Sequence, residues 1–289
     1  MRDLTITDVR VHPGDSAFLA DDGQTAILYD TGFAFTGYGV ADNIARVLGE
    51  RKLDWIFLTH SHYDHALGSA YVRRRWPDVK IAAGSYAAKI FQKPTARAVM
   101  RELDRKCALE NGIAEYEDLI DELHVDLALE DGDVIEAGDL RFTAVALPGH
   151  TRCSMGFYEA SRKLLLSCET PGVFDGESVV VPSYLVGYQM ALDSIARVEE
   201  MDIEQILIPH LGLLNREQTA VYLKLARKSA VETAQELADI LKNGGTHAEA
   251  VEHLRRKFYH GRIREAYPPA AFELNAGIKV KLIEKELVE

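Results

Sequence analysis

One short segment, residues 60–65, constrains this chain more than any other because its sequence is HSHYDH. It places three imidazoles and a carboxylate within six positions, and these groups are the ligands that divalent metals such as zinc take in proteins. A lone histidine would favour a structural role, but packing does not require this density of ligands. The segment therefore predicts a metal site.

The flanking sequence indicates where the segment lies in the fold. Residues 54–58 are short, apolar and rich in aromatic and branched side chains, which predicts a buried strand. Residues 66–76 have a helical composition. We therefore expect the histidines on a loop at the carboxyl end of a strand, where α/β sheets commonly place their sites. On such a turn His60 and His62 can face one metal, while Asp64 and His65 face another.

Charge and composition exclude several classes of partner. The net charge of −12 over 289 residues argues against nucleic acid and against an anionic membrane surface. No apolar run approaches the roughly 18 residues of a membrane-spanning helix. The three cysteines form no pattern, which fits a reducing cytosol, and the first residues alternate rather than forming the apolar core of a signal peptide. We expect a cytoplasmic protein that acts on a small molecule.

The order of predicted elements indicates a layered α/β domain followed by a helical extension. Polar and apolar alternation and short apolar runs predict strands, and wider apolar spacing predicts helices. A segment rich in Ala, Arg, Glu and Leu predicts two or three inserted helices at residues 85–123. We place one domain at residues 1–214 and the helical extension at 215–289, where Thr246 and Glu249 predict a capping box. The predicted strands are residues 4–11, 24–29, 54–58, 79–83, 125–129, 133–136, 140–147, 155–159, 164–168 and 205–208, and the predicted helices of the first domain outside the insertion are 40–53, 66–76 and 186–201.

Further ligands follow other predicted strands. His150 stands at the tip of a Pro-Gly turn, His210 follows Pro209, and Glu169 follows the strand at 164–168. With the first cluster they make a set for two metals about 3.5–4 Å apart. For the other histidines we expect structural roles, exposed or capping. These are His12, His124, His247, His253 and His260.

At this point the pattern resembles the metallo-β-lactamase-fold superfamily. The H-x-H-x-D-H segment, a Pro-Gly-His turn, an acid at a strand end and a late histidine carry the resemblance over about residues 1–215, and Asp30 in an Asp-Thr-Gly turn adds to it. The resemblance implies an αββα sandwich with a metal site at one edge between two sheets. It implies two metal ligand sets: His60, His62 and His150 for the first metal, and Asp64, His65 and His210 for the second.

Glu169 departs from the family pattern, which usually has an aspartate that bridges both metals. A glutamate is one methylene longer, which leaves both a bridged pair and a single metal open. Cys168 is a rival ligand, since some members use a cysteine on the corresponding strand. Adjacent strand residues face opposite sides, so only one of the two should point at the metals. We favour Glu169 and expect Cys168 to be a buried, small apolar residue.

Such a site fits hydrolysis. A metal-bound water has its pKa lowered towards about 7 and can attack a carbonyl or phosphoryl centre. Asp64 can orient that water or move its proton, and Asp30 can accept an N–H from a ligand imidazole. Thr59 and Thr151 are hydroxyl partners or strand-end caps. Zinc is the default metal for histidine-rich ligands, and iron or manganese stays open because a carboxylate favours harder ions.

Specificity should come from segments outside the sandwich. Residues 85–123 are a candidate lid. In related hydrolases a tyrosine or histidine from the loop corresponding to residues 171–188 contacts the substrate oxygen, which makes Tyr184 or Tyr188 a candidate catalytic residue; packing is the alternative. The C-terminal helices would wall the pocket, as in related thioesterases of the glyoxalase II type, or form a homodimer.

The favoured function is a metal-dependent hydrolase of a small ester, thioester or lactone. The first alternative is an iron-dependent redox enzyme that oxidises persulfides or reduces oxygen or nitric oxide. Relatives that reduce oxygen or nitric oxide carry a glutamate where this chain has His62, which weighs against that kind. Phosphodiesterase activity and nucleic-acid processing are further alternatives, the latter opposed by the acidic charge, and a complete ligand set disfavours a non-catalytic metal-binding module.

Overall fold

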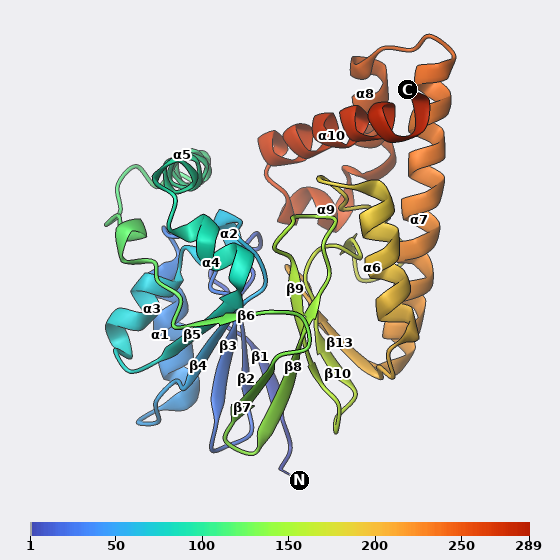
Figure 1. The fold of residues 1–289 in the computed structure, drawn as a ribbon. Helices are drawn as coiled ribbons and strands as arrows, with labels where there is room; N and C mark the ends of the chain where they lie inside the picture. Colours follow the sequence, from blue (N-terminus) through green and yellow to red (C-terminus); the bar gives the residue numbers. More distant parts are fainter. Residues whose placement is uncertain (1) are drawn as a thin grey trace. The chain divides into compact units, whose positions relative to one another are not determined.

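The structure is a computed structural model that describes residues 2–289. Met1, at which the predicted first domain begins, lies outside the described residues. The chain forms two compact units (Figure 1). Unit 1 comprises residues 2–146 and 155–167, and unit 2 comprises residues 147–154 and 168–289. The predicted division between residues 214 and 215 stays a prediction.

A mixed sheet forms one half of unit 1, and its strands lie in sequence order. The first three strands pair antiparallel, and the remaining pairs are parallel. The inner parallel strands carry almost continuous apolar sequence, as expected when both faces of a sheet are covered. The strands are β1 (Thr5–Asp8), β2 (Phe18–Asp21), β3 (Ala26–Tyr29), β4 (Trp55–Leu58), β5 (Lys80–Gly84) and β6 (Leu127–Leu129).

An antiparallel meander forms the other half of unit 1. It consists of β7 (Val134–Ala137), β8 (Leu140–Ala146), β9 (Met155–Glu159) and β10 (Leu164–Leu166). Aromatic side chains join the two halves: Phe57 of β4 stacks on Phe157 of β9 at 4.6 Å between ring centroids, and its ring meets that of Phe142 of β8 edge-on at 5.3 Å. The two sets of strands therefore pack against each other over one apolar core.

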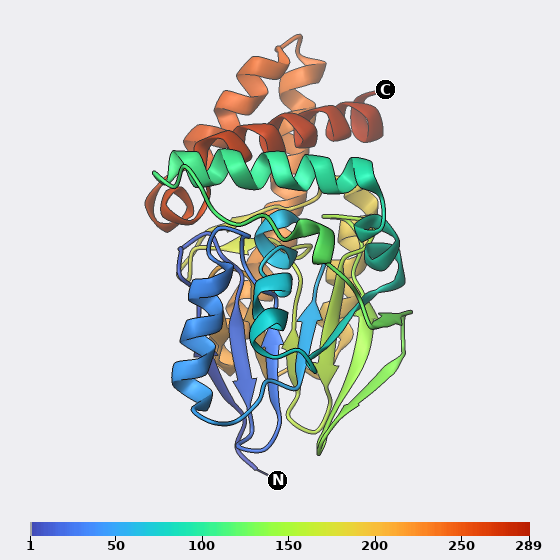
Figure 2. The same ribbon diagram turned by 90° about the vertical axis from the view of Figure 1, so that its left-hand side faces the viewer.

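The helices of unit 1 lie outside this core. Figure 2 shows α1 and α3 over one face of the mixed sheet and α5 running across the ends of its strands. The helices predicted for residues 85–123 are present as α4, α5 and η1. The bounds are α1 (Gly37–Leu48), α2 (Tyr63–Ala66), α3 (Ser69–Arg75), α4 (Ser85–Phe91), α5 (Pro94–Glu110) and η1 (Ile120–Glu122).

Unit 2 is mainly helical, with two short hairpins. Alanines on the long helix α7 allow close packing, and the aromatic ring of Phe272 on α10 fills the same core. The predicted capping box is present, since Thr246 Oγ1 accepts a hydrogen bond from the Glu249 N–H at 3.2 Å. The elements are β11 (Val173–Phe174), β12 (Val180–Val181), α6 (Tyr188–Glu200), β13 (Gln205–Ile208), β14 (Gly212–Leu214), α7 (Arg216–Lys242), α8 (His247–Phe258), α9 (Gly261–Ala266), α10 (Pro269–Ile283) and η2 (Glu284–Val288).

Two differences from the predicted elements stand out. The strands β2, β11, β12 and β14, which have two to four residues each, were not predicted. The predicted strand 164–168 is too long, since β10 ends at Leu166. Cys168 and Glu169 therefore lie outside the strand, and the prediction that they face opposite sides of it was wrong. Among the residues described, no helix is both long and apolar enough to cross a membrane.

The last residues of the chain hold the start of α6. The Glu286 carboxylate accepts hydrogen bonds from the backbone N–H groups of Tyr188, at 3.1 and 3.3 Å, and of Gln189, at 3.3 Å. These groups belong to the first turn of α6, where no helical carbonyl can accept from them. The negative charge also lies at the positive end of the helix dipole. The final turn of the chain therefore supports the segment that leads into α6.

We expect Glu286→Ala to lower the free energy of unfolding by about 1 kcal/mol, because it removes the cap of α6. Glu265→Ala, which removes an exposed carboxylate on α9, is the control and should change stability by less than about 0.5 kcal/mol. Urea unfolding followed by circular dichroism measures both. Equal effects of the two substitutions would contradict the capping role.

Candidate metal centre

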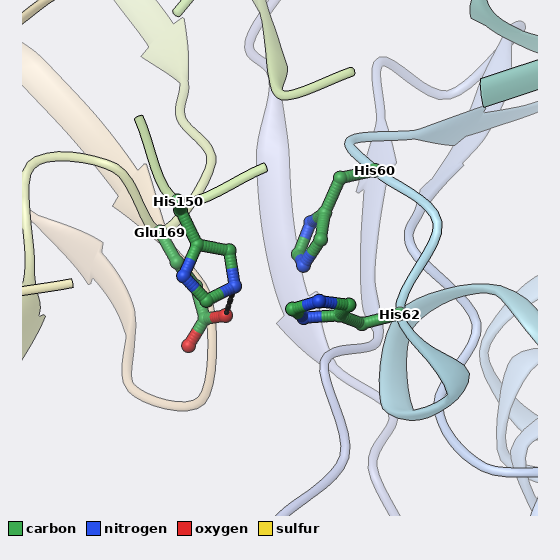
Figure 3. A group of neighbouring side chains, drawn as sticks. All are labelled: His60, His62, His150 and Glu169. Atoms are coloured by element: carbon green, nitrogen blue, oxygen red, sulfur yellow. Dashed lines mark ion pairs between the residues drawn. The ribbon is translucent and has the colours of Figure 1, made fainter. Parts of the chain in front are cut away.

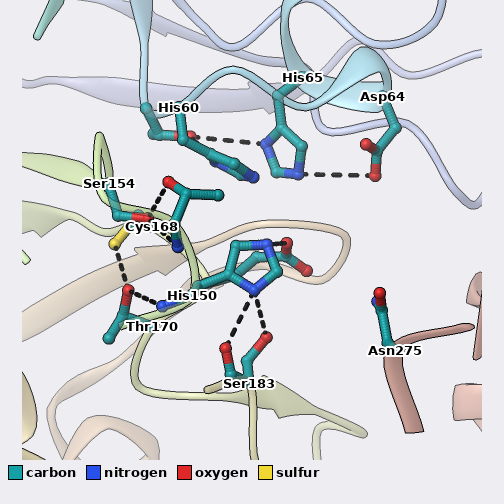
Figure 4. Close-up of polar contacts among 12 residues, drawn as sticks. His60, Asp64, His65, His150, Ser154, Cys168, Thr170, Ser183 and Asn275 are labelled. Atoms are coloured by element: carbon teal, nitrogen blue, oxygen red, sulfur yellow. Dashed lines mark hydrogen bonds and ion pairs between the residues drawn. The ribbon is translucent and has the colours of Figure 1, made fainter. Parts of the chain in front are cut away.

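Unit 1 gathers four of the predicted ligands after β4. His60 and His65 are fully buried, whereas His62 and Asp64 are partly exposed. The His60 ring lies 4.6 Å from the His62 ring and 4.0 Å from the His65 ring between centroids. Asp64 Oδ2 is 3.6 Å from His65 Nε2 (Figure 4). The start of α2 at Tyr63 produces this cluster, because it turns Asp64 and His65 back beside the residues that precede the helix.

Asp30 supports this cluster from the end of β3. Its buried carboxylate accepts hydrogen bonds from His65 Nδ1 at 2.7 Å, from the Thr59 N–H at 2.8 Å, from Thr59 Oγ1 at 3.0 Å and from Ser16 Oγ at 2.9 Å. The predicted hydrogen bond between Asp30 and the imidazole of a candidate ligand is thus present. Asp30 also adopts a φ of 51°, a conformation uncommon outside glycine and concentrated at functional sites.

In unit 2 the Pro-Gly-His turn presents His150. Gly149 has a φ of 139°, and a Cβ there would lie 2.6 Å from the Ala191 Cα of α6, so no larger residue fits. His150 Nδ1 lies 3.0 Å from the Ser183 carbonyl oxygen and 2.9 Å from Ser183 Oγ. His150 Nε2 pairs with the Glu169 carboxylate at 2.8 Å (Figure 3).

Glu169 contacts two of the predicted ligands in unit 2. While one of its oxygens meets His150, the other, Oε1, lies 3.3 Å from His210 Nε2. His210 follows β13 with a φ of 63°, again in the left-handed region. Cys168 instead turns its Sγ to the Leu147 carbonyl oxygen at 3.8 Å, and burial raises its pKa to about 11. The preference for Glu169 as the ligand agrees with these contacts, although the reason given for it was wrong.

The ligand types in both units suit a divalent metal. In His60, His65 and His150, Nδ1 lies next to a protein oxygen, which directs Nε2 of each ring to the opposite side. Zinc ligands are commonly imidazoles fixed in this way. Two sets therefore have the chemistry of metal ligands, and Figure 3 draws the first of them: His60, His62, His150 and Glu169, and then Asp64, His65 and His210.

The remaining histidines have the structural surroundings that we expected. Four of them form a hydrogen bond near the surface, either with a side chain or with the backbone. The fifth, His12, packs its ring against two phenylalanines and forms a hydrogen bond with Asn111. These are His124, His247, His253, His260 and His12. None of the five belongs to either ligand set found among residues 2–289.

Both candidate tyrosines lie in the apolar core of unit 2. The exposed fraction of Tyr184 is 1%, and its ring meets that of Tyr188 edge-on at 5.3 Å. Burial raises the pKa of the Tyr184 hydroxyl, and Tyr184 Oη has no hydrogen-bond partner among the described residues. A role for either tyrosine at the substrate stays a prediction.

Sequence reasoning missed Ser183, which lies in the loop before α6. Its carbonyl and hydroxyl fix the ring of His150 from 33 positions away, a link that no local pattern indicates. Thr59 does contact a predicted ligand, since its Oγ1 lies 3.0 Å from His60 Nδ1. The Thr151 hydroxyl meets Ser154 Oγ at 2.8 Å and so organises the turn around His150.

Comparison with known families decides the classification. The family model described as "Metallo-beta-lactamase superfamily" matches residues 10–210, which is more than half of the chain. The chain belongs to this superfamily. The family identified from the sequence is confirmed, and so is the α/β fold with inserted helices and a helical C-terminal extension.

Individual members of the superfamily are distant relatives. "Glyoxylase B2" from Dictyostelium discoideum is 27% identical over 144 residues, which cover 49% of this chain and 41% of that protein. "Acyl-coenzyme A thioesterase MBLAC2" from Gallus gallus is 25% identical over 168 residues, or 55% of this chain and 57% of that protein. The matches thus span about half the length of these relatives. A metallo-beta-lactamase family protein from Thermus thermophilus shares the fold, with a TM-score of 0.64 and 19% identity over 98% of this chain and 93% of that one.

We expect Asp30→Asn to weaken zinc binding about 10- to 100-fold, because an amide cannot accept from His65 and Thr59 as the carboxylate does. Competition with a chromophoric chelator measures the affinity. Asp78→Asn, at an exposed position of the same unit, is the matched control and should bind zinc as the unaltered protein does. An affinity within twofold for Asp30→Asn would contradict the supporting role.

We expect Tyr184→Phe to leave the free energy of unfolding unchanged or higher, because it removes a buried hydroxyl that no described residue bonds. Tyr222→Phe is the matched control: its hydroxyl donates to the Gly172 carbonyl at 2.8 Å, and its loss should lower stability by about 1 kcal/mol. Urea unfolding compares the two. A fall in turnover without a fall in stability would assign the Tyr184 hydroxyl to the substrate, whereas a clear destabilisation would show that the hydroxyl bonds in the core.

Proposed function

We propose that the two ligand sets bind a pair of divalent metal ions, and that the protein is a metal-dependent hydrolase of a small ester or thioester. One observation carries the proposal: Glu169 meets His150 with one carboxylate oxygen and His210 with the other. His150 and His210 belong to different ligand sets, so a carboxylate held between them is suited to join two metals.

Zinc is the metal that the ligand set favours. Imidazole ligands predominate and suit zinc, while the carboxylates of Asp64 and Glu169 leave iron or manganese as alternatives. A divalent metal pair in such a site supplies a water of lowered pKa and polarises the substrate carbonyl. Membership of the superfamily supports this chemistry, since the H-x-H-x-D-H segment lies within the matched residues.

The side chains of the cluster take the other parts of the reaction. The Asp64 side chain is 21% exposed and lies beside the buried His65, so it can orient an attacking water and accept its proton. Asp30 and Ser183 hold the rings of His65 and His150 in one orientation each, which fixes the direction of the ligand nitrogens. The protein thereby prepares the site before substrate binds.

Thioesters are the substrate class that we place first. A relative named as an acyl-coenzyme A thioesterase and another named as a glyoxylase match about half of this chain at 25% and 27% identity. Their names support hydrolysis of an acyl compound over phosphodiester cleavage. Lactones stay in the substrate panel because they present the same acyl carbonyl to an attacking water.

We expect His62→Ala and His150→Ala each to lower the metal content and to reduce kcat/KM by at least about 10³-fold, because both residues would hold the same metal pair. Elemental analysis by mass spectrometry and a panel of thioesters, esters and lactones measure the two effects. His124→Ala, a surface substitution beside Asp126, is the control.

This experiment is informative because His62 and His150 belong to the same ligand set although they are far apart in the sequence. Loss of the same metal from both variants supports joint binding. Turnover that persists in metal-free buffer, or metal loss confined to one of the two variants, would refute the proposed site.

A further inference from the structure

A tyrosine of the long helix α7 is buried in unit 2 beside the turn that carries Glu169. The exposed fraction of Tyr222 is 0%, and its hydroxyl donates a hydrogen bond to the Gly172 carbonyl oxygen at 2.8 Å. Its ring also packs against Phe174, at 5.4 Å between ring centroids. Burial raises the pKa of this hydroxyl, which therefore stays protonated and can donate at neutral pH. Tyr222 thus connects α7 to one carbonyl group of the turn.

The turn at residues 169–172 is closed by a backbone hydrogen bond. The Gly172 N–H donates to the Glu169 carbonyl oxygen at 2.8 Å, which is typical of a β-turn. Gly172 has a φ of 118°, and a Cβ there would lie 2.4 Å from Val180 Cγ1, so a larger residue does not fit. Gly172 accepts from Tyr222 with its carbonyl oxygen and donates to Glu169 with its N–H. Two hydrogen bonds in series therefore connect the Tyr222 hydroxyl with the backbone of Glu169.

A second side chain, Thr170, holds the same turn at its other end. Thr170 Oγ1 donates to the Leu147 carbonyl oxygen at 2.6 Å and accepts a hydrogen bond from the His150 N–H at 3.3 Å. Figure 4 shows this hydroxyl in contact with Cys168 and with the backbone of His150. The segment that carries Glu169 is therefore fixed to the segment that carries His150. Tyr222 completes this support at the far end of the turn.

The helix α7 holds this part of unit 2 at more than one point. Besides the hydrogen bond of Tyr222, Ser229 Oγ donates to the Val180 carbonyl oxygen at 2.6 Å. Gly172 directly precedes β11, and Val180 lies in β12, so α7 is bonded beside one strand of the hairpin and on the other. The residues that the family model matches end at residue 210, whereas α7 begins at Arg216. The helical extension thus contributes to the surroundings of a candidate ligand.

Glu169 needs this support because its side chain is flexible. It is longer than an aspartate and rotates about an additional bond, so its carboxylate keeps one position only if the backbone is fixed. The carboxylate meets His150 Nε2 at 2.8 Å with one oxygen and His210 Nε2 at 3.3 Å with the other. A shift of the turn would change both distances at once. Loss of the Tyr222 hydroxyl would therefore disturb the residue that the proposed function places between two metals.

We propose that Tyr222 is a positioning residue for Glu169. Its hydrogen bond to Gly172 holds the turn in the conformation that places the Glu169 carboxylate between His150 and His210, and thereby raises the affinity for metal. The proposal rests on the proposed function for the role of Glu169 as a ligand, and it extends the metal centre to the helix α7. Tyr222 touches neither metal nor substrate in this scheme.

Zinc affinity tests the proposal without any activity. Tyr222→Phe removes only the hydroxyl, and we expect it to weaken zinc binding about 10-fold in competition with a chromophoric chelator. Tyr259→Phe is the matched control, because it makes the same change in unit 2 and removes a hydroxyl that donates to the Tyr267 carbonyl oxygen at 3.1 Å. Both variants should unfold at a lower urea concentration, but Tyr259→Phe should bind zinc within about twofold of the unaltered protein. Equal zinc affinities of Tyr222→Phe and the unaltered protein overturn the proposal.

A double-mutant cycle tests whether Tyr222 acts through Glu169. In the Glu169→Gln background the five candidate imidazoles and Asp64 remain, so zinc binding should stay measurable. We expect Tyr222→Phe to weaken zinc binding less than about twofold there, against about 10-fold in the unaltered background. Losses of the same size in both backgrounds would show that Tyr222 acts by another route and would overturn the proposal. Absence of zinc binding by the unaltered protein would refute the proposed function and this inference with it, whereas zinc binding that does not respond to Tyr222→Phe would refute the inference alone.

Hydrogen exchange on the unaltered, metal-free protein covers a variant that misfolds. If Tyr222 holds the turn before metal binds, the Gly172 N–H should already exchange at least about 100-fold more slowly than in an unfolded chain. Mass spectrometry of peptides that contain residues 169–172 follows this exchange. Protection that develops only after zinc is added would show that the metal orders the turn, and it would overturn the proposal.

Discussion

The buried carboxylate of Asp30 is the interaction on which the arrangement of unit 1 depends. It accepts hydrogen bonds from Ser16, Thr59 and His65, which come from three separate segments of the chain. Burying a carboxylate without such donors would be strongly unfavourable. The hydrogen bonds therefore stabilise the buried Asp30 and also fix the position of the three segments that donate them. The end of β3, the loop after β4 and the helix α2 are thereby fixed against one another. The orientation of the His65 ring follows from this network rather than from the ligand sequence itself.

The main features of the candidate site were predictable because their chemistry is concentrated in the sequence. Histidines at residues 60, 62 and 65 have few structural explanations, and each distant ligand follows an apolar run that marks a strand. The content of Ala, Arg, Glu and Leu identified the helices of the insertion. The spacing of Thr246 and Glu249 identified the capping box. The rule that α/β sheets commonly place their sites at the carboxyl ends of strands then indicated the position of residues 60–65. Local patterns and topology rules agreed on the same location.

What could not be predicted depends on long-range packing. The contacts of Ser183 with His150 and of Tyr222 with Gly172 are set by the way α6 and α7 pack, and neither leaves a periodic signal. The short strands β2 and β14 were also missed. The contacts agree with the choice of Glu169 over Cys168. Alternation along a strand does not explain this choice, because both residues follow β10 and lie outside it.

The path of the chain between the units has a consequence for how the protein can be made and divided. The polypeptide leaves unit 1 after residue 146, returns at residue 155 and leaves again after residue 167. No single peptide-bond cut therefore separates one unit from the other. During synthesis, unit 1 cannot be completed until residue 167 has left the ribosome, by which time the first segment of unit 2 is already present. Fragments, fusions and circular permutants of this chain must keep all three crossings intact.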